Sequence, residues 1–240
     1  MKNAWKNKSH HAFYKKGIGK FLHKERSKYI KGTLLKISGA DTHSIPKLMI
    51  DLGCGDGVLT EDLQMNSLKI LAIDFDINRI LKIKDKTGLN TKLLVSDVTH
   101  LALKDSSADI ILIHHVIEHV DSPDEEVINN CRDILRQGGY LIIGIPNEDS
   151  FLGRLSRRIH PRLYAEGEHI KYYSEKSMTT LVKSKGFSIE SIGRVGFLFP
   201  IYYIHLALIS FKPFFYLGHY LTRLFKTSAD SLIIVCRKDK

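Results

Sequence analysis

Three glycines at two-residue spacing follow an aspartate in the segment Asp51-Leu-Gly-Cys-Gly-Asp-Gly57. Glycine has no Cβ, so a backbone rich in it turns tightly and approaches a ligand closely. The segment follows an apolar run, residues 47–52, and precedes an amphipathic stretch. Because the first turn of a helix has free N–H groups, a helix that starts there can bind a polar or anionic group. The segment therefore predicts a ligand-binding loop between a buried strand and a helix.

The spacing of these glycines differs from that of a dinucleotide-binding loop, which needs Gly-x-Gly-x-x-Gly. If the motif starts at Gly53, its third glycine should be residue 58, which is Val58. If it starts at Gly55, the third glycine should be residue 60, which is Thr60. Together with the aspartate ahead of the loop, this favours a ligand that carries an amino acid in place of a pyrophosphate. Asp74 ends the next apolar run and can accept hydrogen bonds from both hydroxyls of a ribose. Asp97 follows the third run.

Short apolar runs alternate with amphipathic stretches from residue 47 onward. The apolar runs predict strands over residues 47–52, 69–74, 91–95, 109–114, 140–145, 187–195 and 231–237. The amphipathic stretches predict helices over residues 58–68, 77–84, about 122–136 and 174–185. This order is typical of an α/β fold with a seven-stranded, mostly parallel sheet and helices on both faces. Ser122 and Glu125 predict a capping box at the start of the third helix.

At these residues the chain resembles the class I S-adenosylmethionine-dependent methyltransferases, which have a Rossmann-like fold. The resemblance covers about residues 47–147 and includes the segments 108–120 and 131–143. It implies that S-adenosyl-L-methionine is the cofactor. Its methionine part would bind at Asp51, Gly53, Cys54, Gly55 and Gly57, its ribose at Asp74 beside Phe75, and its adenine at Asp97 and Val98, while His114 and His115 would line the methyl-transfer site.

Methyl transfer to a hydroxyl is helped by a base that removes the proton, and the ordinary pKa of histidine suits that task. The candidates are His115, Glu118, His119 and His169. Residues 115–119 also resemble ubiquinone-pathway O-methyltransferases, in which a glutamate and a later Glu-His pair are associated with a divalent metal. His115 replaces that first glutamate, and magnesium prefers oxygen ligands, so no metal is predicted. A structural role for the Glu118–His119 pair, or for His169 in its loop, is the alternative.

The excess positive charge is concentrated at the start of the chain. The net charge is +10, and residues 1–36 contain eleven of the 36 lysines and arginines but one acidic residue, Glu25. Residues 1–40 are interpreted as a basic arm ahead of a methyltransferase domain over residues 41–240. Such an arm, with aromatic residues interspersed, can contact an anionic membrane surface or a nucleic acid. A helical extension that caps the core is the alternative.

The most apolar part of the chain is residues 195–211, interrupted by Pro200 and His205. Its length is marginal for a membrane span. Because it separates two strands of one predicted sheet, the chain must leave and return on the same side, which excludes a single crossing. Residues 196–228 therefore predict a hydrophobic helical insertion before the last strand. It would act as a lid, an acceptor pocket or a membrane-surface anchor, or else as a dimer contact or additional core.

Three functions remain open from the sequence. The first is methyl transfer to oxygen on a small, hydrophobic or lipid-linked acceptor. The second is methylation of RNA or protein docked through the arm, although Asn/Asp-Pro-Pro-Tyr is absent and Pro146 precedes Asn147 rather than a cysteine. The third is a non-catalytic, membrane-associated module. Three scattered cysteines and the lack of a signal-peptide pattern predict a cytoplasmic setting, with peripheral association at the inner membrane surface as a further expectation.

Overall fold

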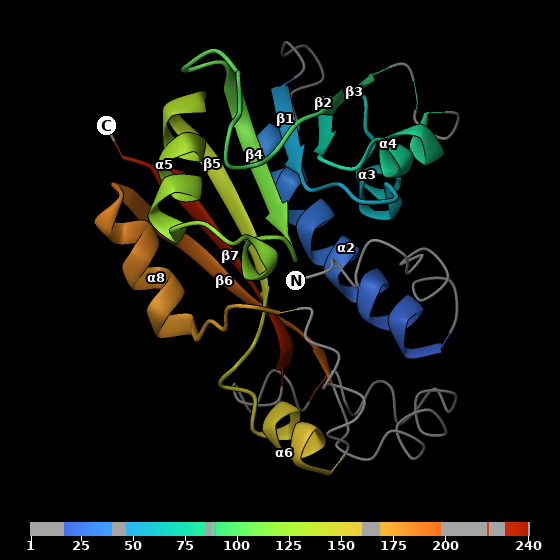
Figure 1. The fold of residues 1–240 in the computed structure, drawn as a ribbon, viewed down its shortest axis with the longest axis vertical. Coiled ribbons are helices and arrows are strands. Elements are labelled where there is room, and N and C mark those ends of the chain that lie inside the picture. Colours follow the sequence, from blue (N-terminus) through green and yellow to red (C-terminus); the bar gives the residue numbers. More distant parts are fainter. Residues whose placement is uncertain are drawn as a thin grey trace.

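A computed structural model describes residues 17–39, 47–84, 88, 90–159, 169–197, 220 and 229–239. Its centre is a seven-stranded sheet in the order β3-β2-β1-β4-β5-β7-β6 (Figure 1). The strands are β1 (Lys47–Leu52), β2 (Leu68–Asp74), β3 (Thr91–Val95), β4 (Ala108–His114), β5 (Leu135–Pro146), β6 (Phe187–Phe197) and β7 (Ala229–Lys238). All pairs are parallel except those of β7, which runs antiparallel to both β5 and β6. The predicted α/β fold with a mostly parallel sheet is confirmed.

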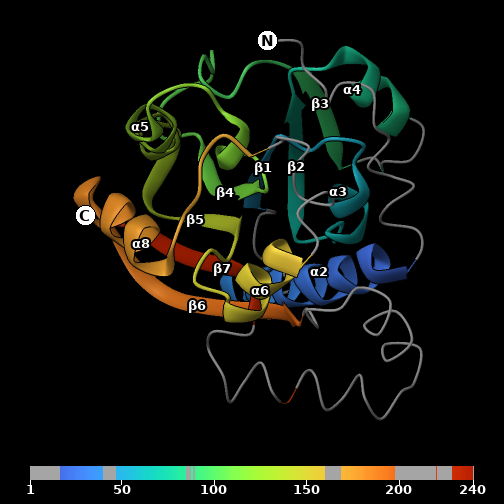
Figure 2. The ribbon, with the colours of Figure 1, turned by 60° about the horizontal axis from the view of Figure 1, so that its bottom comes forward.

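Helices cover both faces of the sheet, as Figure 2 shows. They are α2 (Gly17–Ser38), α3 (Val58–Asp62), α4 (Ile77–Ile83), α5 (Asp124–Ile134), α6 (Phe151–Ile159), α8 (Glu175–Ser184) and the short 3-10 helix η2 (Ile117–His119). One buried cluster joins the sheet to α5 and α8, and a second joins it to α2 and α4. Within the described ranges, no helix is long and apolar enough to cross a membrane.

The central strands are apolar throughout because both of their faces are buried. In β4, Ile111 and Ile113 belong to the core under α5 and α8, whereas Ile110 and Leu112 belong to the core under α2 and α4. Side chains alternate between the faces of a strand, so a strand covered on both faces has a continuous apolar run. This is why the short apolar runs of the sequence located the strands.

Helix α2 shows how part of the predicted basic arm is placed. Ile30 and Leu34 are fully buried against the sheet. The ring of Tyr29 fills the space above Gly193 of β6, where an added Cβ would lie 2.3 Å from the ring. Residues 17–38 thus cover one face of the sheet, as a helical extension would, while residues 1–16 lie outside the described part.

Several predicted boundaries are wrong. The helix expected over residues 58–68 ends at Asp62, and the third helix ends at Ile134, where β5 begins. The expected capping box is absent, because the N-cap is Pro123 and no side chain bonds to the cap. The carbonyl of Ser122 instead accepts a hydrogen bond from the Lys171 ammonium. Most of the predicted insertion lies outside the described residues.

Candidate active site

The residues expected to bind the cofactor lie at the carboxyl edge of the sheet, where the strand order reverses. β1 pairs with β2 on one side and with β4 on the other, so the loops after β1 and β4 start side by side. A Cβ added to Gly53 would lie 2.3 Å from Cγ2 of Val116, which follows β4. The two loops are therefore in contact at a topological switch point, the usual ligand site of an open α/β sheet.

The loop between β1 and α3 requires glycine at both of its ends. Gly53, Gly55 and Gly57 have φ angles of 72°, 57° and 75°, in the left-handed region that side chains disfavour. A Cβ on Gly57 would lie 2.1 Å from Cγ2 of Ile83 in α4. The glycine spacing therefore reflects both backbone conformation and close packing of the loop against its neighbours.

Replacing Gly57 by alanine should destabilise the fold. The left-handed conformation and the clash with Ile83 should together lower the free energy of unfolding by about 2–5 kcal/mol, measurable by urea unfolding. Gly32→Ala is the matched control, because Gly32 lies inside α2 with nothing within 4 Å of an added Cβ. It should raise stability by about 1 kcal/mol. Equal effects of the two substitutions would contradict this account of the loop.

Asp51 is buried at the end of β1 and is held by α3. The Thr60 hydroxyl donates a 2.6 Å hydrogen bond to Oδ2 of Asp51. Burial raises the pKa of Asp51 to about 6, although the bond from Thr60 opposes the shift. The N–H groups of Gly53 and Cys54 both donate to the carbonyl of Ile73, at 2.7 and 2.9 Å. Asp51 and the loop are thus fixed to α3 and β2 respectively.

Asp74 stands at the end of β2 and faces the glycine loop. Its two carboxylate oxygens accept hydrogen bonds from the N–H of Gly55, at 2.8 Å, and of Asp76, at 3.0 Å. Each oxygen keeps a further lone pair for a ligand hydroxyl. Burial raises the pKa of Asp74 above its ordinary value. Phe75, the next residue, is 42% exposed, so an apolar ring lies beside a buried acid.

Asp97 follows β3 and is exposed, unlike the other two acids. Its Oδ1 accepts hydrogen bonds from the N–H and the hydroxyl of Thr99, at 2.9 and 2.8 Å. Val98 is buried beneath it and packs in the core with β1 and β4. The ends of β1, β2 and β3 thus present Asp51, Asp74 and Asp97 along one edge of the sheet.

His115 follows β4 in an unusual backbone conformation. Its φ is 54°, in the left-handed region, which costs a non-glycine residue free energy and marks functional sites. Its Nδ1 lies 2.9 Å from Oε1 of Glu118, whose side chain is only 1% exposed. The other ring nitrogen, Nε2, is buried and has no hydrogen-bond partner in the described structure. A carboxylate therefore orients this imidazole through Nδ1 and leaves Nε2 without a partner among the described residues.

The electrostatics of this pair keep the imidazole neutral. Burial, followed by the charge of Arg26, lowers the pKa of His115 well below its ordinary value. Burial also raises the pKa of Glu118. His114 precedes His115, and its ring packs against Gly144 of β5, where an added Cβ would lie 2.3 Å from Cδ2. Burial lowers the pKa of His114 as well.

His119 and His169 lie together next to Glu118. Their ring centroids are 4.9 Å apart, and the N–H groups of Ile170 and Lys171 donate to the Glu118 carbonyl. The possible ligand atoms of Glu118, His119 and His169 all lie within 4.8 Å of one another. Two imidazoles and one carboxylate suit a transition metal better than magnesium. The set therefore does not fit the oxygen ligands that magnesium prefers.

A family model described as a methyltransferase domain matches residues 21–192, most of the chain. The chain belongs to the S-adenosylmethionine-dependent methyltransferases. S-adenosylmethionine is accordingly its methyl donor. The match begins inside α2, so this helix is part of the methyltransferase domain as the family model defines it.

Two relatives of the methyltransferase have names of different detail, one general and one that states a reaction. A probable S-adenosylmethionine-dependent methyltransferase of Mycobacterium tuberculosis is 22% identical over 58% of this chain and 48% of its own length. A ubiquinone biosynthesis O-methyltransferase of Cupriavidus pinatubonensis is 26% identical over 43% of each chain. The chain thus spans about half the length of these relatives.

A solved structure of a possible histamine N-methyltransferase from Thermotoga maritima has the same fold. It superposes with a TM-score of 0.67 at 18% identity, over 95% of this chain and 94% of that one.

The sequence did not reveal two interactions in the candidate active site. The guanidinium of Arg26, in α2, forms a partly buried ion pair with Asp230 of β7. Their charges act on His115, Arg26 lowering and Asp230 raising its pKa. These residues are 204 positions apart, so no local pattern connects them. Thr60 was also missed as the partner of Asp51; its place in the first turn after the loop was the available signal.

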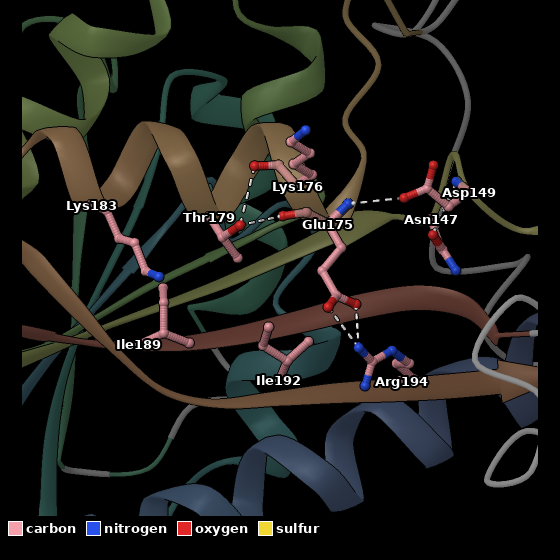
Figure 3. A pocket seen from close by; sticks show the side chains of 9 residues that line it. All are labelled: Asn147, Asp149, Glu175, Lys176, Thr179, Lys183, Ile189, Ile192 and Arg194. Atoms are coloured by element: carbon pink, nitrogen blue, oxygen red, sulfur yellow. Dashed lines mark hydrogen bonds and ion pairs between the residues drawn. The ribbon is translucent and has the colours of Figure 1, made fainter.

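A separate groove of about 550 Å³ lies between α8 and β6 (Figure 3). The Arg194 guanidinium crosses it to both carboxylate oxygens of Glu175, at 2.6 and 2.5 Å. The N–H of Glu175 donates to Asp149 at 3.3 Å. None of the site residues predicted from the sequence lines this groove, so it is distinct from the cluster around His115.

Proposed function

We propose that the methyltransferase transfers a methyl group to a hydroxyl oxygen of a small, hydrophobic or lipid-linked acceptor, with His115 as the general base. The observation that carries this proposal is the His115–Glu118 pair, in which a buried carboxylate fixes Nδ1 and Nε2 lacks a partner among the described residues. Because the imidazole is neutral and its Nε2 makes no hydrogen bond among the described residues, Nε2 can accept a proton.

The donor is proposed to bind along the three strand ends. Asp51 and the glycine loop would hold the methionine part, and Asp74 would accept the ribose hydroxyls. Asp97, Val98 and the exposed ring of Phe75 would contact the adenine. The buried position of Asp74 beside the loop supports this arrangement, because its carboxylate already organises the Gly55 backbone. His114, packed against β5, would form the wall near the transferred group.

Bound S-adenosylmethionine supplies a methyl group on a positively charged sulfur, and alignment of donor and acceptor provides much of the acceleration. His115 Nε2 would take the acceptor proton as the new C–O bond forms and the C–S bond of the donor breaks, which would leave S-adenosylhomocysteine. Glu118 would hold the Nδ1–H and stabilise the imidazolium that results. The choice of oxygen is supported by the name of the ubiquinone-pathway relative and by the pairing of base and carboxylate.

Exposed apolar side chains near the pair support a hydrophobic acceptor. Ile170 and Tyr172 are 50% and 63% exposed, and the backbone N–H of Ile170 bonds to the Glu118 carbonyl. The segment that carries them is therefore joined to the proposed catalytic pair. His119 and His169 are proposed to orient this segment rather than to remove the proton.

The proposed acceptor class is tested by labelled methyl transfer into cell extract separated into lipid, small-molecule, RNA and protein fractions. Label is expected in the lipid or apolar small-molecule fraction. Label in RNA or protein would replace this proposal with a macromolecular acceptor. If calorimetry detects binding of neither S-adenosylmethionine nor S-adenosylhomocysteine, the protein is not an active methyltransferase and the proposal is rejected.

Donor binding should weaken in acid because Asp51 must be ionised to attract the methionine ammonium group. With a pKa of about 6, the carboxyl is mostly protonated at pH 5. The affinity for S-adenosylhomocysteine should therefore fall about tenfold between pH 7 and pH 5, as measured by calorimetry. Asp51→Asn should bind weakly at both values and lack the transition near pH 6. An unchanged transition in this variant would assign the titration to another group.

A further inference from the structure

Helix α6 carries apolar and basic residues on separate faces. Its sequence, Phe-Leu-Gly-Arg-Leu-Ser-Arg-Arg-Ile, contains three arginines and no acidic residue. Phe151, Leu155 and Ile159 recur at four-residue spacing and so lie along one face of the helix. Arg154 and Arg158 each precede a member of this row by one position and line the adjacent face. The apolar row thus runs the length of the helix, and the basic row lies along its second half.

The apolar face of α6 is exposed at both of its ends, while Leu155 between them is half-buried. Phe151 is 57% exposed and Ile159 is 45% exposed, and Arg154 and Arg158 are exposed beside them. The Arg154 guanidinium bonds to the Glu148 carbonyl at 3.2 Å, which keeps it next to the start of the helix. In Figure 1, α6 projects beyond the carboxyl ends of the strands, away from both helical layers.

The entry to α6 is fixed to the same edge as the candidate active site. The N–H of Asn147 donates to the Asp230 carbonyl, and its side-chain amide donates to the Ala229 carbonyl at 3.0 Å. The N–H of Glu148 donates to the Tyr173 carbonyl at 3.3 Å. The exposed Tyr172 therefore lies on the segment beside the entry to α6.

We infer that α6 is a membrane-surface helix that binds bilayers containing anionic lipid. Its arginines complement negatively charged headgroups, and its exposed phenylalanine and isoleucine can enter the boundary of the acyl chains. An RNA partner would use the arginines but would leave the aliphatic face in water, so the bilayer fits both faces better. This contact does not depend on the proposed acceptor, but it would turn the active-site edge toward lipid.

The test is sedimentation of the full chain with phosphatidylcholine vesicles prepared with and without phosphatidylglycerol. Partitioning onto the anionic vesicles is expected, together with a decrease when salt is raised. Phe151→Ser/Ile159→Ser should weaken it at least tenfold. Arg154→Glu/Arg158→Glu should weaken it by about 25-fold or more, since each basic side chain near such a surface contributes about fivefold.

Matched controls change exposed apolar or basic residues elsewhere on the chain. Ile77→Ser/Leu81→Ser alters two exposed apolar residues on α4, and Lys92→Glu/Lys104→Glu makes the same charge change away from α6. Both should partition like the unchanged protein. Equal losses in controls and α6 variants, unaltered partitioning of the α6 variants, or binding to polyuridylate instead of vesicles would overturn the inference.

Failure of this inference can be distinguished from failure of the proposed function. The α6 variants should retain their affinity for S-adenosylhomocysteine and their melting temperature, because none of the residues proposed to bind the donor lies on α6 and the substituted side chains are exposed. Vesicle binding without any methyl transfer would reject the proposed function alone. If the unchanged protein transfers methyl groups but does not bind anionic vesicles, the membrane contact alone is rejected.

Discussion

Asp74→Ala should lower the affinity for S-adenosylhomocysteine by about 100-fold or more. Two hydrogen bonds from ribose hydroxyls to a charged acceptor would contribute about 1.5–3 kcal/mol each, and every 1.4 kcal/mol corresponds to about tenfold in affinity. The substitution also removes the acceptor of the Gly55 N–H, a 2.8 Å bond that organises the glycine loop. Calorimetric titration measures the loss directly.

Asp109→Ala is the matched control for this substitution. Asp109 also accepts a backbone N–H, that of Leu48 at 2.8 Å, but it stands at the start of β4, on the opposite edge of the sheet from Asp74. Its loss should leave the affinity for S-adenosylhomocysteine within about twofold, even if stability falls. Retention of full affinity by Asp74→Ala would remove this residue from the donor site.

The second large effect concerns the proposed base. His115→Asn should reduce kcat for transfer into the labelled fraction by about 10²–10⁴-fold, the usual contribution of a general base. Asparagine tolerates the left-handed conformation that position 115 adopts better than most residues, so the backbone should persist. Affinity for S-adenosylhomocysteine should stay within about twofold, which separates loss of chemistry from loss of binding.

Two comparisons make this prediction specific. His119→Asn should reduce kcat by less than about tenfold if that imidazole only orients the neighbouring segment, in contrast to removal of a base. Since the pKa of His115 is lowered well below its ordinary value, the imidazole stays neutral in mild acid. At saturating S-adenosylmethionine, kcat of the unchanged enzyme should therefore remain level as pH falls through 6.5, even though donor binding weakens. A greater loss in His119→Asn than in His115→Asn would assign the base to His119.

Local chemistry predicted the strands and the glycine loop that joins β1 to α3 well. The run at β1 ended at its predicted residue because a strand buried on both faces is apolar until the chain leaves the sheet. The glycine loop was equally readable, since its left-handed residues and its contact with Ile83 leave glycine as the residue that fits. Asp51 and Asp74 then followed from their positions at the ends of neighbouring strands.

Long-range contacts explain what the sequence could not show. The amphipathic pattern after residue 122 indicated a helix, but β5 starts at Leu135 because that residue pairs with Ala108, and a register shift follows it. Gly138, at φ 70°, belongs to this irregular strand instead of ending a helix. Likewise, nothing in the sequence distinguished Arg26 from the other basic residues of the arm, because its partner Asp230 is close to it only in the folded chain.

The position of β7 has a consequence for how the chain acquires its structure during synthesis. β7 lies between β5 and β6, so until residues 229–238 leave the ribosome, β5 has an open edge and β6 lacks its only partner in the sheet of the described residues. Helix α2 is synthesised early, but the hydrophobic cluster into which it packs is incomplete until Ile233 and Val235 are present. An unpaired edge invites association with other chains. The nascent protein should therefore depend on protection of β5 until its last strand inserts.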